Sequence, residues 1–101
     1  MKVHHIGAKN TVLNTFIAEL RDQKIQKDSM RFRRNIERIG EILAYEMSKE
    51  LPYKSEIIST PLGTKIMQLS DENMVLCSIL RAGLPLHRGV LNYFDKIDNA
   101  F

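Results

Sequence analysis

Several features that would place this chain in a specialised class are scarce or missing. Its 101 residues include one cysteine, three prolines and no tryptophan, so the sequence predicts neither a disulfide framework nor a proline-rich segment. The longest apolar run is far too short to cross a membrane, and the start, Met1 to His5, lacks the hydrophobic core of a signal peptide. No repeat or linker divides the chain. We therefore expect one cytoplasmic domain, or part of one.

Cysteine and histidine, which often act as nucleophiles or metal ligands, are poorly placed for these roles in this sequence. Cys77, the only cysteine, lies within an apolar stretch, where we interpret it as a small core residue rather than a nucleophile. His4 and His5 are neighbours, and on a strand they would point to opposite faces, which disfavours joint metal binding. The sequence therefore predicts no metal ligands and no catalytic side chain of these types.

Hydrophobic spacing predicts two helices in the first half of the chain. The first runs from about Thr11 to Arg21, with Asn10 or Thr11 as its cap. The second runs from about Ser29 to Lys49, with Asp28 or Ser29 as its cap. The apolar positions of the second helix predict this buried stripe: Phe32, Ile36, Ile39, Leu43 and Met47.

The net charge of +3 and the pI near 9.2 raise the possibility of a nucleic-acid partner. The densest basic patch, Arg31 to Arg38, also contains Glu37, and Arg33 with Glu37 and Arg38 with Glu41 are spaced to pair on a helix surface. This is a mixed face rather than a stripe of one sign, and no aromatics are interleaved for base stacking. A small basic nucleic-acid-binding module is therefore the least favoured interpretation.

The middle of the chain predicts a β-hairpin over residues 54–70. Glu56 to Thr60 and Thr64 to Leu69 are β-prone, and Pro61-Leu62-Gly63 between them is typical of a tight turn. A polar turn at Asp71-Glu72-Asn73 follows.

The stretch from Met74 to Gly89 predicts a strand, a loop and a helix. Met74 to Leu80 is apolar without polar alternation, which predicts a strand covered on both faces. Arg81, Ala82 and Gly83 follow, and Pro85 suits a first helical turn. The helix then has apolar residues at helical spacing: Leu86, Val90, Leu91 and Phe94. An anion at the loop would meet one guanidinium, backbone N–H groups and the positive end of the helix.

The exact residues of this stretch indicate a family more specifically than its strand–loop–helix pattern does. Ile79-Leu80-Arg81-Ala82-Gly83-Leu84, followed by Gly89-Val90-Leu91, resembles the pyrophosphate loop of uracil phosphoribosyltransferases, which are type I phosphoribosyltransferases. Leu20-Arg21-Asp22, Arg31-Phe32-Arg33 and Thr60-Pro61-Leu62-Gly63 occur upstream in that family's order. The resemblance implies the N-terminal portion of that α/β fold: a helical segment (1–53), a hairpin arm (54–70), then the first core parallel strand, the pyrophosphate loop and a helix (74–94).

The resemblance also implies an activity and its site. The family joins uracil to phosphoribosyl pyrophosphate, giving uridine monophosphate and pyrophosphate in pyrimidine salvage, with magnesium bound to the donor. Arg81 matches the arginine that binds the pyrophosphate, assisted by the main chain of Ala82 and Gly83, and the Leu80 to Arg81 bond is implied to be cis. GTP binding and a homodimer or higher homo-oligomer, with the arm in its contacts, are implied as well. No nucleic-acid or membrane partner is expected.

Several alternatives stay open at this point. Arg81 would have only a structural role if it capped the strand end in an internal salt bridge. Residues 54–70 would likewise have only a structural role if they formed a simple edge hairpin. Pro85 stands where the family often has glycine, and Arg88 is interpreted as a surface arginine rather than a phosphate ligand. A non-catalytic nucleotide-binding or regulatory relative is the main functional alternative.

Family members are about twice as long as this chain. We therefore expect the N-terminal half of such an enzyme, inactive by itself. Only one parallel core strand is predicted, so the chain alone should not be a stable monomer.

Overall fold

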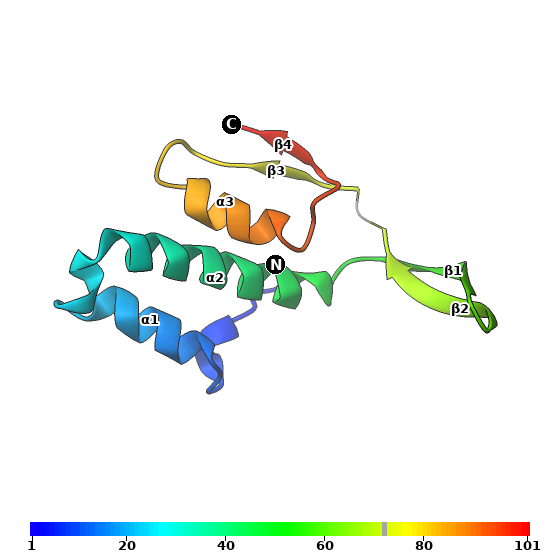
Figure 1. Ribbon diagram of the computed structural model, residues 1–101, viewed down its shortest axis with the longest axis horizontal. Helices are drawn as coiled ribbons and strands as arrows, with labels where there is room; N and C mark the ends of the chain where they lie inside the picture. Colours follow the sequence, from blue (N-terminus) through cyan, green and yellow to red (C-terminus); the bar gives the residue numbers. More distant parts are fainter. Residues whose placement is uncertain (72) are drawn as a thin grey trace.

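The chain folds into helices stacked beside a small parallel sheet, with a hairpin projecting from one end (Figure 1). The computed structural model describes residues 1–71 and 73–101; Glu72, in the predicted polar turn, lies outside the described residues. The elements are α1 (Leu13–Arg21), α2 (Ser29–Ser48), β1 (Tyr53–Thr60), β2 (Gly63–Ser70), β3 (Val75–Cys77), α3 (Leu84–Leu91) and β4 (Asp98–Ala100). Short 3-10 turns occupy Ile6–Ala8 and Ile25–Lys27. The predicted α/β order is confirmed.

Polar side chains accept hydrogen bonds from free backbone N–H groups at the starts of the first two helices, although the N-cap of α1 is Val12 rather than the predicted Asn10 or Thr11. The Thr11 hydroxyl oxygen accepts a hydrogen bond from the N–H of Leu13 at 3.2 Å. Asp28, a predicted cap, accepts one from the N–H of Arg31 at 3.1 Å. At the C-terminal end of α2, a 2.9 Å hydrogen bond to Glu46 raises the pKa of Lys49 above its ordinary value.

Helix α2 lies between α1 and α3 (Figure 1), so it is buried on two sides. The predicted single stripe is therefore only partly right: Phe32, Leu43 and Met47 are exposed. The residues that are fully buried on α2 are small or polar: Asn35, Gly40 and Ala44. Small residues are needed there because α3 comes close to the α2 backbone.

The predicted surface ion pairs of α2 form with other partners. Glu37 pairs with Arg34 at 3.3 Å, not with Arg33. The Arg38 guanidinium lies 5.3 Å from the ring centre of Phe16 on α1, and Glu41 accepts a 2.6 Å hydrogen bond from Asn92 instead. The expectation failed because neighbouring helices supply contacts that spacing along one helix does not reveal.

The hairpin is confirmed and is longer than predicted. Strands β1 and β2 pair from Tyr53 with Ser70 to Thr60 with Gly63. The turn requires glycine, because Gly63 has a φ of +136°. The Thr60 hydroxyl donates a 2.8 Å hydrogen bond to the Gly63 carbonyl oxygen and closes the turn. We call residues 53–70 the arm.

The second sheet corrects two predictions. Strand β4 pairs in parallel with β3, with Val75 opposite Asp98 and Cys77 opposite Ala100, so the described residues include two parallel strands rather than the one predicted. Helix α3 covers only one face of this sheet (Figure 1). Val75 is accordingly 63% exposed, and Cys77 is exposed rather than a core residue. The prediction of burial on both faces assumed a cover that these residues do not supply.

The core lies between α2, the end of α3 and β3. Its buried members are Ala44, Phe94 and Ile97, with Leu51, Met74, Leu76, Val90 and Leu91 packed against them. Of the four apolar residues at helical spacing, Phe94 is buried, Val90 and Leu91 are partly buried, and Leu86 is 37% exposed. Within the described ranges, no helix has the length and hydrophobicity needed to span a membrane.

Candidate functional site

The loop between β3 and α3 carries all the predicted site residues. Strand β3 ends at Cys77 and α3 begins at Leu84, with Arg81, Ala82 and Gly83 in consecutive turn positions. The Leu80–Arg81 peptide bond is cis, as the family resemblance implied. The loop is closed by its own backbone, because the Leu84 N–H donates to the Arg81 carbonyl oxygen at 3.1 Å.

Arg81 is exposed and its guanidinium is available to a ligand. Among residues 1–71 and 73–101, no carboxylate pairs with it, so the interpretation of Arg81 as a salt-bridged strand cap finds no support there. A guanidinium presents several N–H donors in a planar fork, which suits phosphate oxygens. The arrangement can therefore bind an anion at the loop, although the role of Arg81 stays a prediction.

Ala82 and Gly83 differ in what their backbones offer. The N–H of Gly83 already donates to the Ile79 carbonyl oxygen at 3.2 Å. For the N–H of Ala82, the described part of the chain supplies no acceptor. Only glycine fits at position 83, because a Cβ there would lie 2.8 Å from the Ile79 oxygen. Ala82 thus offers a free backbone donor, and Gly83 permits the tight turn; their predicted part in pyrophosphate binding remains untested.

A buried histidine that the sequence patterns did not predict lies behind this loop. His87 of α3 is hydrogen-bonded through Nδ1 to the Ser78 hydroxyl and through Nε2 to Oδ1 of Asn99, the latter at 2.7 Å. A single histidine among the apolar residues of a predicted helix gave no signal of such a role. The partners are Ser78, directly after β3, and Asn99, in β4, which only the fold brings together.

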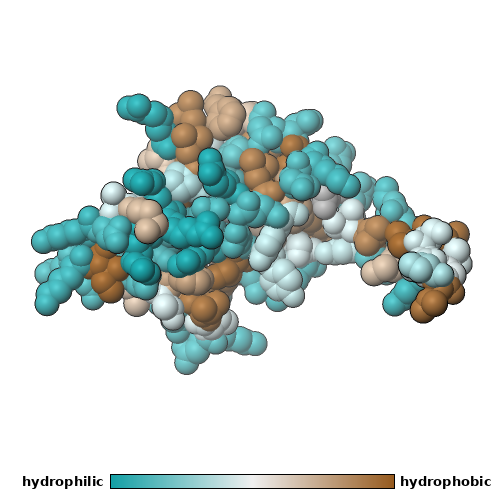
Figure 2. Space-filling view, viewed as in Figure 1, coloured by the Kyte–Doolittle hydropathy of each residue, from teal (hydrophilic) through white to brown (hydrophobic). Residues whose placement is uncertain are grey.

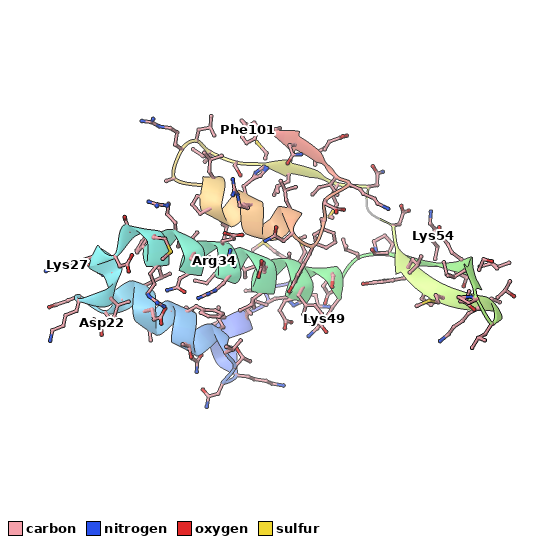
Figure 3. All side chains as sticks on the ribbon, viewed as in Figure 1. Asp22, Lys27, Arg34, Lys49, Lys54 and Phe101 are labelled. Carbon is pink, nitrogen blue, oxygen red and sulfur yellow. The ribbon has the colours of Figure 1, made fainter. Side chains whose placement is uncertain are left out.

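An open groove of about 730 Å³ lies between α2 and α3. Three arginines line it, Arg33, Arg34 and Arg88, together with apolar residues such as Leu84 and Phe101. Figure 3 labels Arg34 on α2 and Phe101 beyond β4, on the two sides of this space. Arg88 is exposed as expected, but it borders this groove; Arg81 is not among the lining residues. The groove can accept an anionic ligand that also has an apolar part.

The described residues do not form a resident metal site. Across residues 1–71 and 73–101, no three His, Cys, Asp or Glu side chains come together around one point. His4 lies 3.7 Å from a carboxylate oxygen of Glu50, and Asp95 and Asp98 are exposed near β4. The magnesium that the family resemblance implies stays a prediction.

Comparison with known proteins identifies the family. The uracil phosphoribosyltransferase family model matches residues 7–100, which include the whole loop. The chain belongs to the uracil phosphoribosyltransferase family. Among relatives of that name, the Porphyromonas gingivalis protein is 52% identical over 101 residues, which is 100% of this chain and 47% of that protein. The Sulfolobus acidocaldarius protein is 40% identical over 83 residues, or 79% of this chain and 38% of that protein.

A solved structure shares the fold of this family member. The AQ2163 protein from Aquifex aeolicus superposes with a TM-score of 0.77 at 23% identity, covering 90% of this chain and 43% of that one. At this identity the likeness concerns the fold alone. Since the chain spans less than half the length of these relatives, the site described here is the part of the family's architecture that residues 1–101 supply.

Proposed function

We propose that this protein acts as a uracil phosphoribosyltransferase in pyrimidine salvage, with residues 1–101 supplying the donor's pyrophosphate site. In the proposed reaction a ring nitrogen of uracil bonds to the anomeric carbon of phosphoribosyl pyrophosphate. The bond from that carbon to pyrophosphate breaks, and the uracil nitrogen loses its proton. The observation that carries the proposal is Arg81, which is exposed and has no ion-pair partner among the described residues, on the turn before α3 in a chain of this family.

The proposed contribution of the loop is electrostatic. Negative charge develops on pyrophosphate as it departs, and a fixed guanidinium with a backbone N–H stabilises that charge. Arg81 would supply the guanidinium and Ala82 the N–H, while the first turn of α3 adds its partial positive charge. Magnesium belongs to the substrate in this proposal and is bound by the donor's phosphates.

A homodimer or higher homo-oligomer is part of the same proposal, with the arm in its contacts. The arm is an isolated pair of strands, and such a pair is marginally stable in water. Ile57 and Ile66 lie opposite each other and are 73% and 67% exposed. Figure 2 shows hydrophobic residues gathered on the arm, away from the body of the molecule. A second copy that covers these residues would stabilise the arm; a simple edge hairpin would leave them exposed.

GTP binding, which the family resemblance implies, is proposed for the groove between α2 and α3. Arg33 and Arg88 would bind the phosphates, since Arg34 is paired with Glu37, and Phe101 offers an aromatic face to the base. Titration calorimetry with GTP checks this: we expect binding to weaken at least tenfold in Arg33→Ala and to be unchanged in Arg21→Ala. Equal affinity in both variants would place GTP elsewhere.

The basic face of α2 does not favour a nucleic-acid partner. Arg31 lies 3.5 Å from Glu19, Arg34 pairs with Glu37, and Arg38 donates to Asn35 at 3.3 Å. These arginines are engaged within the fold, so they do not form a free stripe for phosphates. We propose a cytoplasmic enzyme of small-molecule substrates.

The test of the proposed function is uracil-dependent release of pyrophosphate from phosphoribosyl pyrophosphate. The product of the complete reading frame is assayed with magnesium, with adenine and hypoxanthine as control bases and the 101-residue chain beside it. We expect the longer product to release pyrophosphate with uracil but not with adenine or hypoxanthine. The 101-residue chain should release none with any base. No release from a folded product would favour a non-catalytic, nucleotide-binding relative.

A further inference from the structure

A buried imidazole connects the donor-binding loop to β4, and the transfer proposed above does not use it. The His87 residue is 5% exposed. Its Nδ1 atom is hydrogen-bonded to the Ser78 hydroxyl, and its Nε2 atom lies 2.7 Å from Oδ1 of Asn99. Ser78 directly follows β3, His87 lies on α3 and Asn99 lies in β4. Three elements therefore meet at one ring.

The partners determine which ring nitrogen carries the proton. Asn99 donates through its side-chain nitrogen to the Ile97 carbonyl oxygen at 3.5 Å, which turns Oδ1 toward His87. Since Oδ1 can only accept, Nε2 of His87 must be the donor. In the neutral ring Nδ1 then accepts the proton of the Ser78 hydroxyl. Donation thus runs from Ser78 to His87 and from His87 to Asn99.

His87 holds both ends of the loop at once. Its backbone N–H donates to the Gly83 carbonyl oxygen at 2.9 Å, while its ring binds Ser78 at the other end. The two ends lie close together, since a Cβ built on Gly83 would lie 3.6 Å from the Ser78 Cβ. The turn between them carries Arg81, whose side chain has no partner of its own among the described residues. The placement of Arg81 therefore depends on the contacts of His87.

The hydrogen bonds of His87 are shielded from solvent on one side. The ring of Phe101 stacks on the imidazole, with centroids 5.1 Å apart and planes inclined by 26°. Within a chain of polar groups, exclusion of water strengthens each hydrogen bond and makes an unsatisfied member costly. Loss of one partner should therefore leave a polar atom of the buried His87 ring without its hydrogen bond, although Asn99 itself is exposed.

We propose that His87 is a positioning residue for the donor-binding loop, fixing through Ser78 and Asn99 the turn that presents Arg81 to the donor's pyrophosphate. This inference rests on the proposed function. His87 itself does not touch the donor in this proposal. It matters because a charge-assisted hydrogen bond forms only in a narrow geometry, and a small misplacement of a binding group lowers its contribution strongly.

The first experiment compares Ser78→Ala with Ser55→Ala in the product of the complete reading frame. Ser55 accepts a hydrogen bond from Gln68 in the arm, so the control removes a similar hydroxyl outside the loop. We expect Ser78→Ala to raise KM for phosphoribosyl pyrophosphate about five- to tenfold, the loss of roughly one hydrogen bond, with KM for uracil within about twofold. Ser55→Ala should change neither constant. Ser78→Thr, which keeps the hydroxyl, should restore the donor KM.

A second pair of variants tests the other side of the ring. Asn99→Asp keeps an acceptor for Nε2, whereas Asn99→Ala removes it. We expect Asn99→Ala to raise the donor KM as Ser78→Ala does, and Asn99→Asp to leave it within about twofold. Nitrogen NMR of the unmodified protein should show the proton of His87 on Nε2. An unchanged donor KM in Ser78→Ala, or a proton on Nδ1 of neutral His87, overturns the inference; the NMR result needs no variant to fold.

The activity of the unmodified protein separates this inference from the proposed function. If the unmodified protein transfers no phosphoribosyl group, the proposed function fails, and calorimetric binding of inorganic pyrophosphate decides the role of His87. Weaker binding by Ser78→Ala than by the unmodified protein would support positioning of the loop. Equal binding by both, or binding by neither, would overturn it.

Discussion

Gly40 of α2 and Gly89 of α3 face each other where the two helices cross, and no side chain separates their backbones. A Cβ on Gly40 would lie 3.2 Å from the Cα of Gly89 and 2.6 Å from the carbonyl oxygen of Leu86. A Cβ on Gly89 would overlap the carbonyl of Glu37. This crossing holds α3, and with it the loop before α3, against the longest helix of the chain.

Replacement of Gly89 by alanine should therefore destabilise the protein. In a free helix the change would stabilise by up to about 1 kcal/mol, since alanine is the better helix former. Here the overlap of the new Cβ with backbone atoms outweighs the gain in helix propensity. We expect a loss of about 3 kcal/mol in the free energy of unfolding, measured by urea denaturation of the full-length protein. Gly7→Ala is the matched control, because a Cβ there meets nothing closer than 3.6 Å. A more stable Gly89→Ala protein would contradict the crossing.

Asn35 connects α1 to α2 through a buried amide. It is 1% exposed, donates to Glu19 at 2.6 Å and accepts from Arg38 at 3.3 Å. We expect Asn35→Ala to lower the free energy of unfolding by about 1–3 kcal/mol, since two charged groups lose a partner. Asn14→Ala, which removes an exposed amide bonded to Asn10, should change it by less than about 0.5 kcal/mol. Equal losses in the two variants would mean that the buried amide contributes nothing special.

The 101-residue chain alone should associate in solution. The arm exposes Ile57 and Ile66, and β3 exposes Val75, so apolar strand surface is uncovered at two places. Sedimentation velocity should show concentration-dependent association. The pair Ile57→Lys with Ile66→Glu keeps a cross-strand contact while removing the apolar surface, and it should reduce association through the arm. Cooperative melting of a species shown to be monomeric would contradict this prediction.

Local patterns predicted much of this fold. Apolar spacing located both long helices, Asp28 marked the start of the second, and Pro61-Leu62-Gly63 marked the turn of the arm. Each of these signals acts within a few residues, so no knowledge of distant contacts is needed. The loop before α3 is also identified by a few consecutive residues, whose sequence indicated both the family and the cis bond.

The features that were missed depend on contacts between distant segments. Asp98–Ala100 has little strand propensity, and it becomes a strand because its backbone pairs with β3. Asn35 and Gly40 looked like surface positions of an amphipathic helix until helices on two sides were known. His87 has its hydrogen-bond partners in Ser78 and Asn99, which lie nine and twelve residues away in sequence. Spacing along one element could not reveal these three features.

The central claim is that the loop before α3 binds the donor's pyrophosphate through Arg81, and donor kinetics of Arg81→Ala test it most directly. In the product of the complete reading frame, we expect KM for phosphoribosyl pyrophosphate to rise about tenfold or more, because a hydrogen bond to a charged group contributes about 1.5–3 kcal/mol. KM for uracil should change little, and Arg21→Ala, which removes an exposed arginine at the end of α1, should leave both constants unchanged. Unchanged donor kinetics in Arg81→Ala would remove Arg81 from the site and contradict the account.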